Sequence, residues 1–396
     1  MEIPETRYAK TADGVHLAYQ VAGDGPIDFV IVGSAFIASV DLSWEFPVTA
    51  AVSRFFAARG RAVLFDRRGI GMSDPVNADD LPPLEVRIED LHAVMDAAGV
   101  DRAVFFGVEE GAAQCLLFGA TYPERTAAII VNGANARGSW APDAPYAWST
   151  DEWEEWFDKI KADFGTPAFV DEHVRWVFPS RAADASFIEL YGRLLRHSLS
   201  PASALALERM EMQMDVRQIL PTVQAPTLVI HFTGDQLEPI EGARDIAARV
   251  PVATLIEAPG SDHLWWPGSR DHAQIDARVD AFLASLKDEE SVFDRVLATV
   301  LSPTSSARPS ERSSWATTPG TRSSPGITRS CGRCSAGTVA GRWKRRATGS
   351  SQPSTGQRGR SDARARSRKR CTRSGSRSEL DFTPGRSKRS AKKSEE

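Results

Sequence analysis

Residues 105–114, FFGVEEGAAQ, place a carboxylate where a turn could hold a nucleophile. An apolar run ends here, a helical pattern follows, and Gly107 and Gly111 flank Glu109. A nucleophile on a tight strand-to-helix turn needs small residues on both sides, because a Cβ at either flank would collide with neighbouring backbone. The spacing predicts a nucleophile elbow in which Glu109 stands where a hydroxyl is usual.

Two further residues have the positions that such a nucleophile needs. Asp235 follows the apolar run TLVIHF, and His263 lies in the polar loop GSDH after the last strand pattern. The order nucleophile, acid, histidine along the chain is typical of α/β hydrolases. Asp235 and His263 are therefore predicted to be triad residues. His231 and His272 carry no comparable signal and are expected to be structural.

Short apolar runs must position these residues. They are unbroken and rich in Val, Ile and Phe, which is typical of strands buried on both faces of a parallel sheet. The predicted strands are 28–33, 62–66, 103–108, 127–133, 227–232 and 254–258. Helical patterns alternate with them at 84–99, 110–125 and 243–250. Strand–helix alternation of this kind predicts an α/β domain with a mostly parallel sheet, over about residues 1–290.

Residues 138–220 break the alternation. They contain no convincing strand, several helical segments and five tryptophans, namely Trp140, Trp148, Trp153, Trp156 and Trp176. A helical insertion between two sheet strands predicts a cap over the carboxyl edge of the sheet, where open α/β sheets place their ligands. The tryptophans are candidates either for the core of this subdomain or for a ligand pocket.

Composition limits the class of protein. No apolar run approaches the roughly 18 residues that span a membrane, and the N-terminus lacks the pattern of a secretory signal. Cys115 is the only cysteine in the first 300 residues, so no disulfide framework is indicated there. We expect a cytoplasmic protein without a membrane span; oligomeric state cannot be predicted.

The elbow, the acid and histidine loops and the segment LFDRRGIGMSD carry a specific resemblance. Residues 4–290 resemble an α/β-hydrolase domain of the actinobacterial type that is fused to class III nucleotide cyclases. In that family the elbow commonly reads G-V-S-E-G-G, so this chain departs from it at Glu109 and Ala112. The resemblance implies an α/β-hydrolase fold, with Ser34 and Glu110 supplying the amides of an oxyanion hole.

Two functions follow from the substituted elbow. The favoured one is a degenerate triad in a non-catalytic domain that binds or senses a small apolar molecule. The alternative is a weak hydrolase of esters or related substrates that uses Glu109, Asp235 and His263, since carboxylates do form covalent intermediates. Glu is one methylene longer than the Asp found at the elbow in related dehalogenases, and a misplacement near 1 Å can lower a rate on the order of 100-fold.

Residues 302–396 have a different character. They carry 23 Lys+Arg and 6 Asp+Glu, a net charge of +17, whereas residues 1–301 carry a net charge of −21. Few apolar residues remain, so we expect a disordered tail. A basic tail suggests a polyanion binder. The pair Cys331 and Cys334 lacks the further ligands of a zinc site, so we expect no metal and no cofactor.

A shifted reading frame explains this tail better than a selected nucleic-acid surface does. In the resembling family, a cyclase would continue after RVLATVL (295–301) as FTDIVGST, and dropping one base from codons for that segment gives SPTSSARP, residues 302–309. The same shift fits segments 341–356 and 380–388. Residues 291–301 are then the remnant of a linker and first cyclase strand. The metal-binding aspartates of a cyclase are absent, so we expect no nucleotide cyclase activity and no specific nucleic-acid partner.

Overall fold

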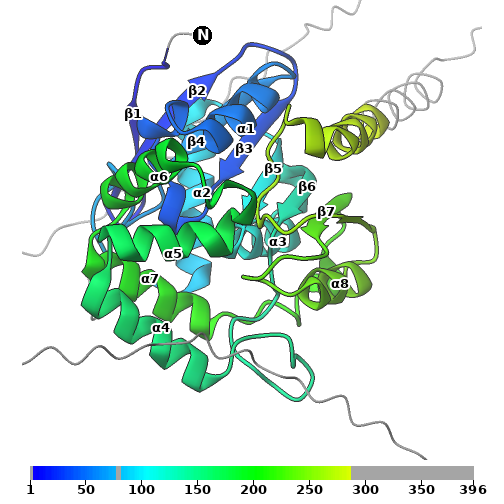
Figure 1. The fold of residues 1–396 in the computed structure, drawn as a ribbon. Helices are drawn as coiled ribbons and strands as arrows, with labels where there is room; N and C mark the ends of the chain where they lie inside the picture. The colour runs from blue at the N-terminus through cyan, green and yellow to red at the C-terminus, as the bar shows by residue number, and fades with distance from the viewer. Residues whose placement is uncertain (1–2, 77–81, 287–396) are drawn as a thin grey trace, which may run out of the picture. The chain divides into compact units, whose positions relative to one another are not determined.

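The computed structural model describes residues 3–76 and 82–286. The described residues form one eight-stranded sheet with the strand order β1-β2-β4-β3-β5-β6-β7-β8 (Figure 1). The strands are β1 (Arg7–Lys10), β2 (His16–Ala22), β3 (Asp28–Val32), β4 (Arg61–Phe65), β5 (Ala103–Val108), β6 (Thr126–Asn132), β7 (Thr227–Phe232) and β8 (Ala253–Ala258). β2 pairs antiparallel with β1 and β4, and every other pairing is parallel. The predicted mostly parallel sheet is confirmed.

The six predicted strands coincide with β3 to β8 to within one residue at each end, but β1 and β2 were not predicted. β1 is short and mostly exposed. β2 carries polar Gln20 inside its apolar pattern, where the Gln20 side chain is buried and accepts a hydrogen bond from Trp44 Nε1 at 2.7 Å. The unbroken apolar signal of a parallel strand is therefore missing from this hairpin.

The expectation of burial on both faces is wrong for β8. Thr254 and Glu257 are exposed, whereas Ile256 and Ala258 are buried. β8 lies at the edge of the sheet. An edge strand has a neighbour on one side only, so its residues are less completely covered than those of the inner strands. The central strands β5 and β7 are buried throughout, as expected.

Helices cover both faces of the sheet. They are α1 (Pro47–Ala57), α2 (Leu84–Ala98), α3 (Glu110–Thr121), α4 (Thr150–Asp163), α5 (Pro167–Val177), α6 (Ala185–Ser198), α7 (Pro201–Gln213) and α8 (Ile240–Arg249), with a further helical segment at 273–286. Alternate residues of β3 divide between two apolar cores: Phe29 and Ile31 join one, Val30 and Val32 the other. Period-two alternation thus builds a layer on each side.

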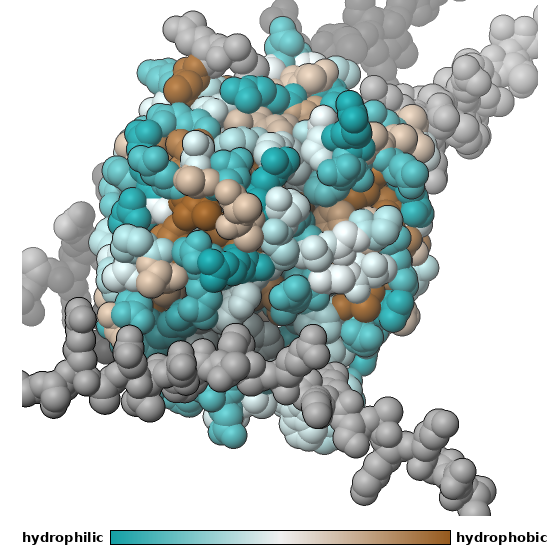
Figure 2. Space-filling view, in the orientation of Figure 1, coloured by the Kyte–Doolittle hydropathy of each residue, from teal (hydrophilic) through white to brown (hydrophobic). Residues whose placement is uncertain are grey.

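Helices α4 to α7 lie between β6 and β7 along the chain, within the segment predicted as a cap (green in Figure 1). Their buried side chains, including Trp153 and Trp156, belong to the same apolar cluster as one face of the sheet. Trp148 and Trp176 are half-buried, and Trp140 is exposed. The surface over these helices is mostly hydrophilic, with separate small apolar patches (Figure 2).

No helix within 3–76 and 82–286 is long and apolar enough to cross a membrane. The predicted remnant at 291–301 and the predicted disordered tail at 302–396 lie outside the described residues.

Candidate active site

Glu109 occupies a strained turn between β5 and α3. Its backbone angles are φ 51° and ψ −126°, and it is the single non-glycine residue with positive φ in the part of the chain that the structure describes. A Cβ added at Gly107 would lie 2.6 Å from Ala112 Cα, and one at Gly111 would lie 2.5 Å from the Val32 carbonyl oxygen. Both positions must therefore be glycine for the backbone to pack, and Glu109 between them adopts the strained conformation.

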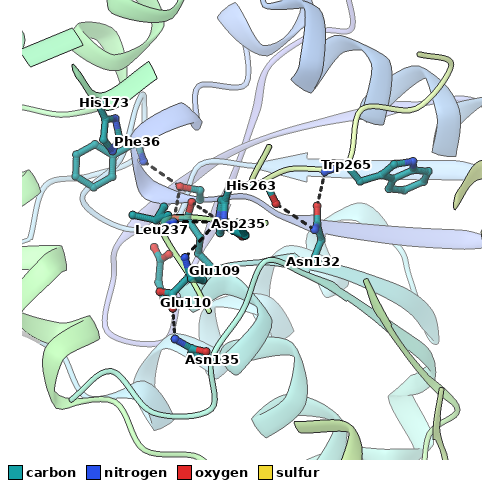
Figure 3. A network of polar contacts seen from close by, with 12 residues as sticks. Phe36, Glu109, Glu110, Asn132, Asn135, His173, Asp235, Leu237, His263 and Trp265 are labelled. Carbon is teal, nitrogen blue, oxygen red and sulfur yellow. Dashed lines mark hydrogen bonds and ion pairs between the residues drawn. The ribbon is translucent and has the colours of Figure 1, made fainter. Parts of the chain in front are cut away.

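The loops after β7 and β8 bring Asp235 and His263 to this turn (Figure 3). His263 Nδ1 lies 2.7 Å from Asp235 Oδ2, and both side chains are fully buried. The backbone N–H groups of Leu237 and Glu238 donate to Asp235 Oδ1 at 2.9 and 3.2 Å. These bonds fix the position of the Asp235 side chain, which in turn orients the imidazole through Nδ1.

The Glu109 carboxylate takes the place beside the other imidazole nitrogen. Its Oε1 lies 3.2 Å from His263 Nε2, an ion-pair distance, although the alignment does not satisfy hydrogen-bond geometry. Its Oε2 accepts a hydrogen bond from Ser34 Oγ at 2.6 Å. The structure therefore brings Glu109, Asp235, His263 and Ser34 together at one point of the sheet edge.

This arrangement changes the protonation of His263. Burial by itself lowers the pKa of the imidazole, but Asp235 and Glu109 outweigh burial and raise the pKa well above its ordinary value. Burial acts to raise the pKa of Glu109, and the paired His263, together with Ser34, lowers it below its ordinary value instead. The stable state is a carboxylate–imidazolium pair.

The two positions expected to supply oxyanion amides flank the same carboxylate. Glu110 begins α3, so its backbone N–H has no acceptor within the helix. Ser34 precedes a 3₁₀ turn at Ala35–Ile37, and its hydroxyl both donates to Glu109 and accepts from Phe36 N at 3.4 Å. The Ser34 side chain thus has a part in the site that the sequence did not indicate.

A buried ion-pair network behind the elbow was also missed. Arg67 pairs with Glu110, and both side chains are almost fully buried. With the Gln114 amide oriented to satisfy its neighbours, its oxygen accepts from Arg67 Nη1 at 2.7 Å and from Arg87 Nη2. The segment LFDRRG was noted as a motif, but the sequence does not show that its charged side chains are buried. Their burial depends on the packing of α3. The network anchors the first turn of α3.

His231 and His272 have structural contacts. The Nε2 of His231 donates to the Glu238 carbonyl at 2.8 Å and lies 3.5 Å from Asp235 Oδ2, and burial lowers its pKa. His272 Nδ1 accepts from Trp266 N at 2.9 Å. His231 thereby buttresses the loop that carries the acid.

Two cavities adjoin the elbow and share Ser34 and Ile37 in their walls. One lies against β3 and α1 and is mostly apolar, with walls that include Val48, Phe106 and Trp265. The other, named here the cap cavity, lies between the elbow and the cap helices. It is lined by aromatic side chains and by carboxylates, namely Phe36, Trp148, Trp153, Trp156, Tyr191, Glu109, Glu208, Glu211 and Glu238.

No group of three or more His, Cys, Asp or Glu side chains in the described ranges is arranged to hold a metal ion. The pair Cys331 and Cys334 lies outside these ranges.

Comparison with known proteins identifies the family of this chain. The family model for the alpha/beta hydrolase fold matches residues 30–265. A protein named carbamate hydrolase RutD from Caulobacter sp. (strain K31) is 27% identical over 261 residues, which cover 64% of this chain and 90% of the relative. The 3-oxoadipate enol-lactonase 1 of Acinetobacter baylyi is 26% identical over 199 residues, which cover 50% of this chain and 68% of the relative.

Solved structures agree in fold. An esterase from Exiguobacterium antarcticum superposes with a TM-score of 0.60 at 18% identity, covering 72% of this chain and all of that chain. A bromoperoxidase from Bacillus anthracis gives a TM-score of 0.59 at 22% identity, covering 71% of this chain and all of that one. At these identities the likeness concerns the fold alone. The family match over most of the described residues settles the assignment: the chain belongs to the α/β-hydrolase fold family.

Proposed function

We propose that this domain binds a small molecule at a degenerate triad without turning it over. The observation that carries the proposal is the Glu109 carboxylate, which stands at the nucleophile position between His263 Nε2 at 3.2 Å and Ser34 Oγ at 2.6 Å. A serine hydroxyl there would pass its proton to a neutral imidazole. Glu109 has no proton to pass and holds the imidazole in its charged form.

The charge state of His263 argues against hydrolysis through Glu109. If Glu109 attacked a substrate, water would have to cleave the resulting ester or acyl intermediate, and a neutral base must activate that water. The raised pKa of His263 keeps the imidazole protonated in the resting site. Neither oxygen of Glu109 is free, because one faces His263 and the other accepts from Ser34.

A weak hydrolase remains the alternative. Two observations favour it: the strained elbow at Glu109 is kept, and relatives of this chain are named hydrolases and lactonases. Covalent attack would discharge Glu109 and lower the pKa of His263 in the intermediate. The two functions therefore differ in which variant at position 109 is active.

Hydrolysis of p-nitrophenyl acetate by the parent, Glu109→Ser and Glu109→Gln separates them. A silenced triad predicts that Glu109→Ser exceeds the parent at least 10-fold, since Asp235, His263 and the amides of Ser34 and Glu110 are kept. Glu109→Ser with His263→Ala is the matched control and should lose the gain. A working Glu109 predicts the reverse order, with an active parent, an inactive Glu109→Gln and an ester adduct on Glu109 detectable by mass spectrometry.

The tail carries a separate proposal. We infer that residues 302–396 are an out-of-frame translation of a cyclase, supported by the ordered frame-shifted matches at 302–309, 341–356 and 380–388. The nucleotide sequence around codon 301 tests it: restoring one base should open a frame that encodes FTDIVGST. If no single-base change does so, the tail belongs to the protein, and polyanion binding through its charge becomes the better account. A cytoplasmic location remains a prediction.

A further inference from the structure

The cap cavity has an aromatic wall of three indoles. The rings of Trp148 and Trp156 stand nearly perpendicular, at 82° with centroids 6.5 Å apart, and Trp153 lies 5.0 Å from Trp148. Such a perpendicular pair points the edge of one ring at the face of the other, and Trp156 also stacks on Phe169 and His173 at 5.4 and 5.6 Å. The half-buried Trp148 is the less covered ring of the pair.

None of these indoles has a spare N–H group for a ligand. Trp148 Nε1 donates to the Leu237 carbonyl at 3.4 Å, Trp153 Nε1 to the Gly138 carbonyl at 2.9 Å and Trp156 Nε1 to Glu208 Oε2 at 2.6 Å. The wall therefore offers a ligand negative π faces and no donor, which favours a cation over an anion.

Carboxylates lie beside the indoles in the lining of the same cavity. Glu208 is 7% exposed; Trp156 satisfies Oε2, and no described residue donates to its Oε1. Glu238 accepts a hydrogen bond from Asn135. Among the described residues, no Lys, Arg or His side chain lies within ion-pair distance of Glu208, Glu211 or Glu238. Burial, together with the neighbouring carboxylates, raises the pKa of Glu208 well above its ordinary value and that of Glu238 to about 8.

The two histidines nearest the cavity do not supply the missing charge. His173 lines the cavity, but burial lowers its pKa to about 4, so it is neutral, and its Nδ1 is hydrogen-bonded to the Tyr191 hydroxyl at 2.7 Å. His263 is paired with Asp235 and Glu109, and its charge only partly offsets the raised pKa of Glu238. A buried carboxylate such as Glu208 is favourable in its ionised form only with a cationic partner.

A second hollow, closer to the surface, is also lined by tryptophans and carboxylates. It has a volume of about 370 Å³ and shares Trp148, Trp156 and Leu237 with the cap cavity. Its remaining walls carry Trp176 and the carboxylates of Glu152, Glu155 and Glu172. Lys159, the one basic side chain among its lining residues in the described part, pairs with Glu172 at 2.5 Å. An excess of negative charge at the mouth of a cavity attracts cationic ligands.

We propose that the cap cavity binds an organic ammonium cation, held by the aromatic side chains around Trp148 and the carboxylate of Glu208. The inference rests on the proposed function, because it names the ligand class of that binding domain, and it replaces the small apolar molecule that the sequence suggested. The cap cavity has room for only a few water molecules. A compact methylated or primary ammonium head group suits this size.

The test compares choline with 3,3-dimethylbutan-1-ol, its uncharged carbon analogue of the same shape, by calorimetry on the full chain. We expect choline to bind at least 30-fold more tightly. Glu208→Gln should weaken choline at least 10-fold and leave the alcohol unchanged, since Gln can still accept from Trp156. Trp148→Leu should weaken choline at least fivefold while keeping the apolar contact for the alcohol. Glu154→Gln removes a charge from the exposed side of α4, outside both hollows, and should change neither affinity.

The outcomes separate this inference from the proposed function. Equal or tighter binding of the alcohol overturns the cationic ligand and leaves a binding domain. If neither compound binds while Glu109→Ser gains esterase activity, the cation is wrong and the degenerate triad stands. If neither binds and Glu109→Ser is inert, both accounts fail. Circular dichroism of each variant shows that a lost affinity comes from a folded protein.

Discussion

Buried glutamates face the cap cavity from two sides and differ in what lies next to them. Glu109, at the elbow, has His263 and Ser34 within contact distance, and its pKa is lowered. Glu208, on cap helix α7, has only the Trp156 indole N–H, and its pKa is raised well above the ordinary value. Burial opposes ionisation at both positions, so the neighbouring charge decides which carboxylate is ionised.

The difference has a functional meaning. At the elbow, His263 supplies the counter-charge of Glu109, which is the basis of the proposed loss of catalysis. At the cap wall, no described residue forms an ion pair with Glu208, and the proposed ammonium ligand would supply the positive charge. Under this proposal, the stability lost by burying Glu208 is the cost of a binding site. Each variant below removes one side of this contrast.

Glu109→Gln should have the largest effect. Breaking a buried ion pair lowers stability by about 3 kcal/mol, because His263 keeps only Asp235 as its partner. The contribution of Glu109 is present above its ordinary pKa of 4.5 and is lost as pH falls through the lowered folded value. The contribution of His263 is present below 6.5 and is lost as pH rises through the raised folded value.

The full penalty of Glu109→Gln is therefore expected between about pH 4.5 and 6.5. Urea unfolding at pH 5.5 and 9 should show a larger loss at the lower pH, and the ring resonances of His263 should report a lowered pKa by NMR. An unchanged titration of His263 would mean that Glu109 does not pair with it in solution.

Glu208→Gln should move stability in the opposite direction and raise the free energy of unfolding at pH 7. The folded pKa of Glu208 lies above its unfolded value of 4.5, so ionisation favours the unfolded chain increasingly as pH rises above 4.5. Glutamine removes this penalty and keeps the bond from Trp156. The gain should vanish below pH 4.5, whereas Glu154→Gln should show no such dependence in the same melts. A loss of stability at pH 7 would show that Glu208 already has a cationic partner.

Ser34→Ala should have the smallest effect, a loss of about 1.5 kcal/mol, the contribution of one hydrogen bond to a charged group. The 2.6 Å bond from Ser34 Oγ to Glu109 Oε2 helps to hold the carboxylate ionised. The same change made in the Glu109→Ser background should lose less, and that double-mutant cycle isolates the contact. Equal losses in both backgrounds would assign Ser34 to the turn at Ala35–Ile37 instead of to Glu109.

Much of the fold could be predicted from the sequence because buried parallel strands appear as short, unbroken apolar runs. A strand buried on both faces must be apolar throughout, and that requirement predicted the strands β3 to β7. The edge strand β8 was predicted from its apolar residues, although it is only partly buried. The elbow was also local, since Gly107 and Gly111 meet Ala112 and Val32 through backbone geometry alone. The hairpin β1–β2 was not predicted because the polar Gln20 interrupts the apolar pattern of β2. Gln20 can be buried there because it accepts a hydrogen bond from Trp44, a residue 24 positions away in the chain.

By itself the sequence determined the fold family, the elbow and the three side chains that meet there. Local apolar patterns indicate where the strands and the loops between them lie. Only the tertiary structure decided the charges. Glu109 and Glu208 are the same residue type, and nothing in the residues beside them along the chain distinguishes their ionisation. His263 approaches one and an indole approaches the other, because folding brings segments distant in the chain into contact, and the pKa of a buried carboxylate depends on those contacts.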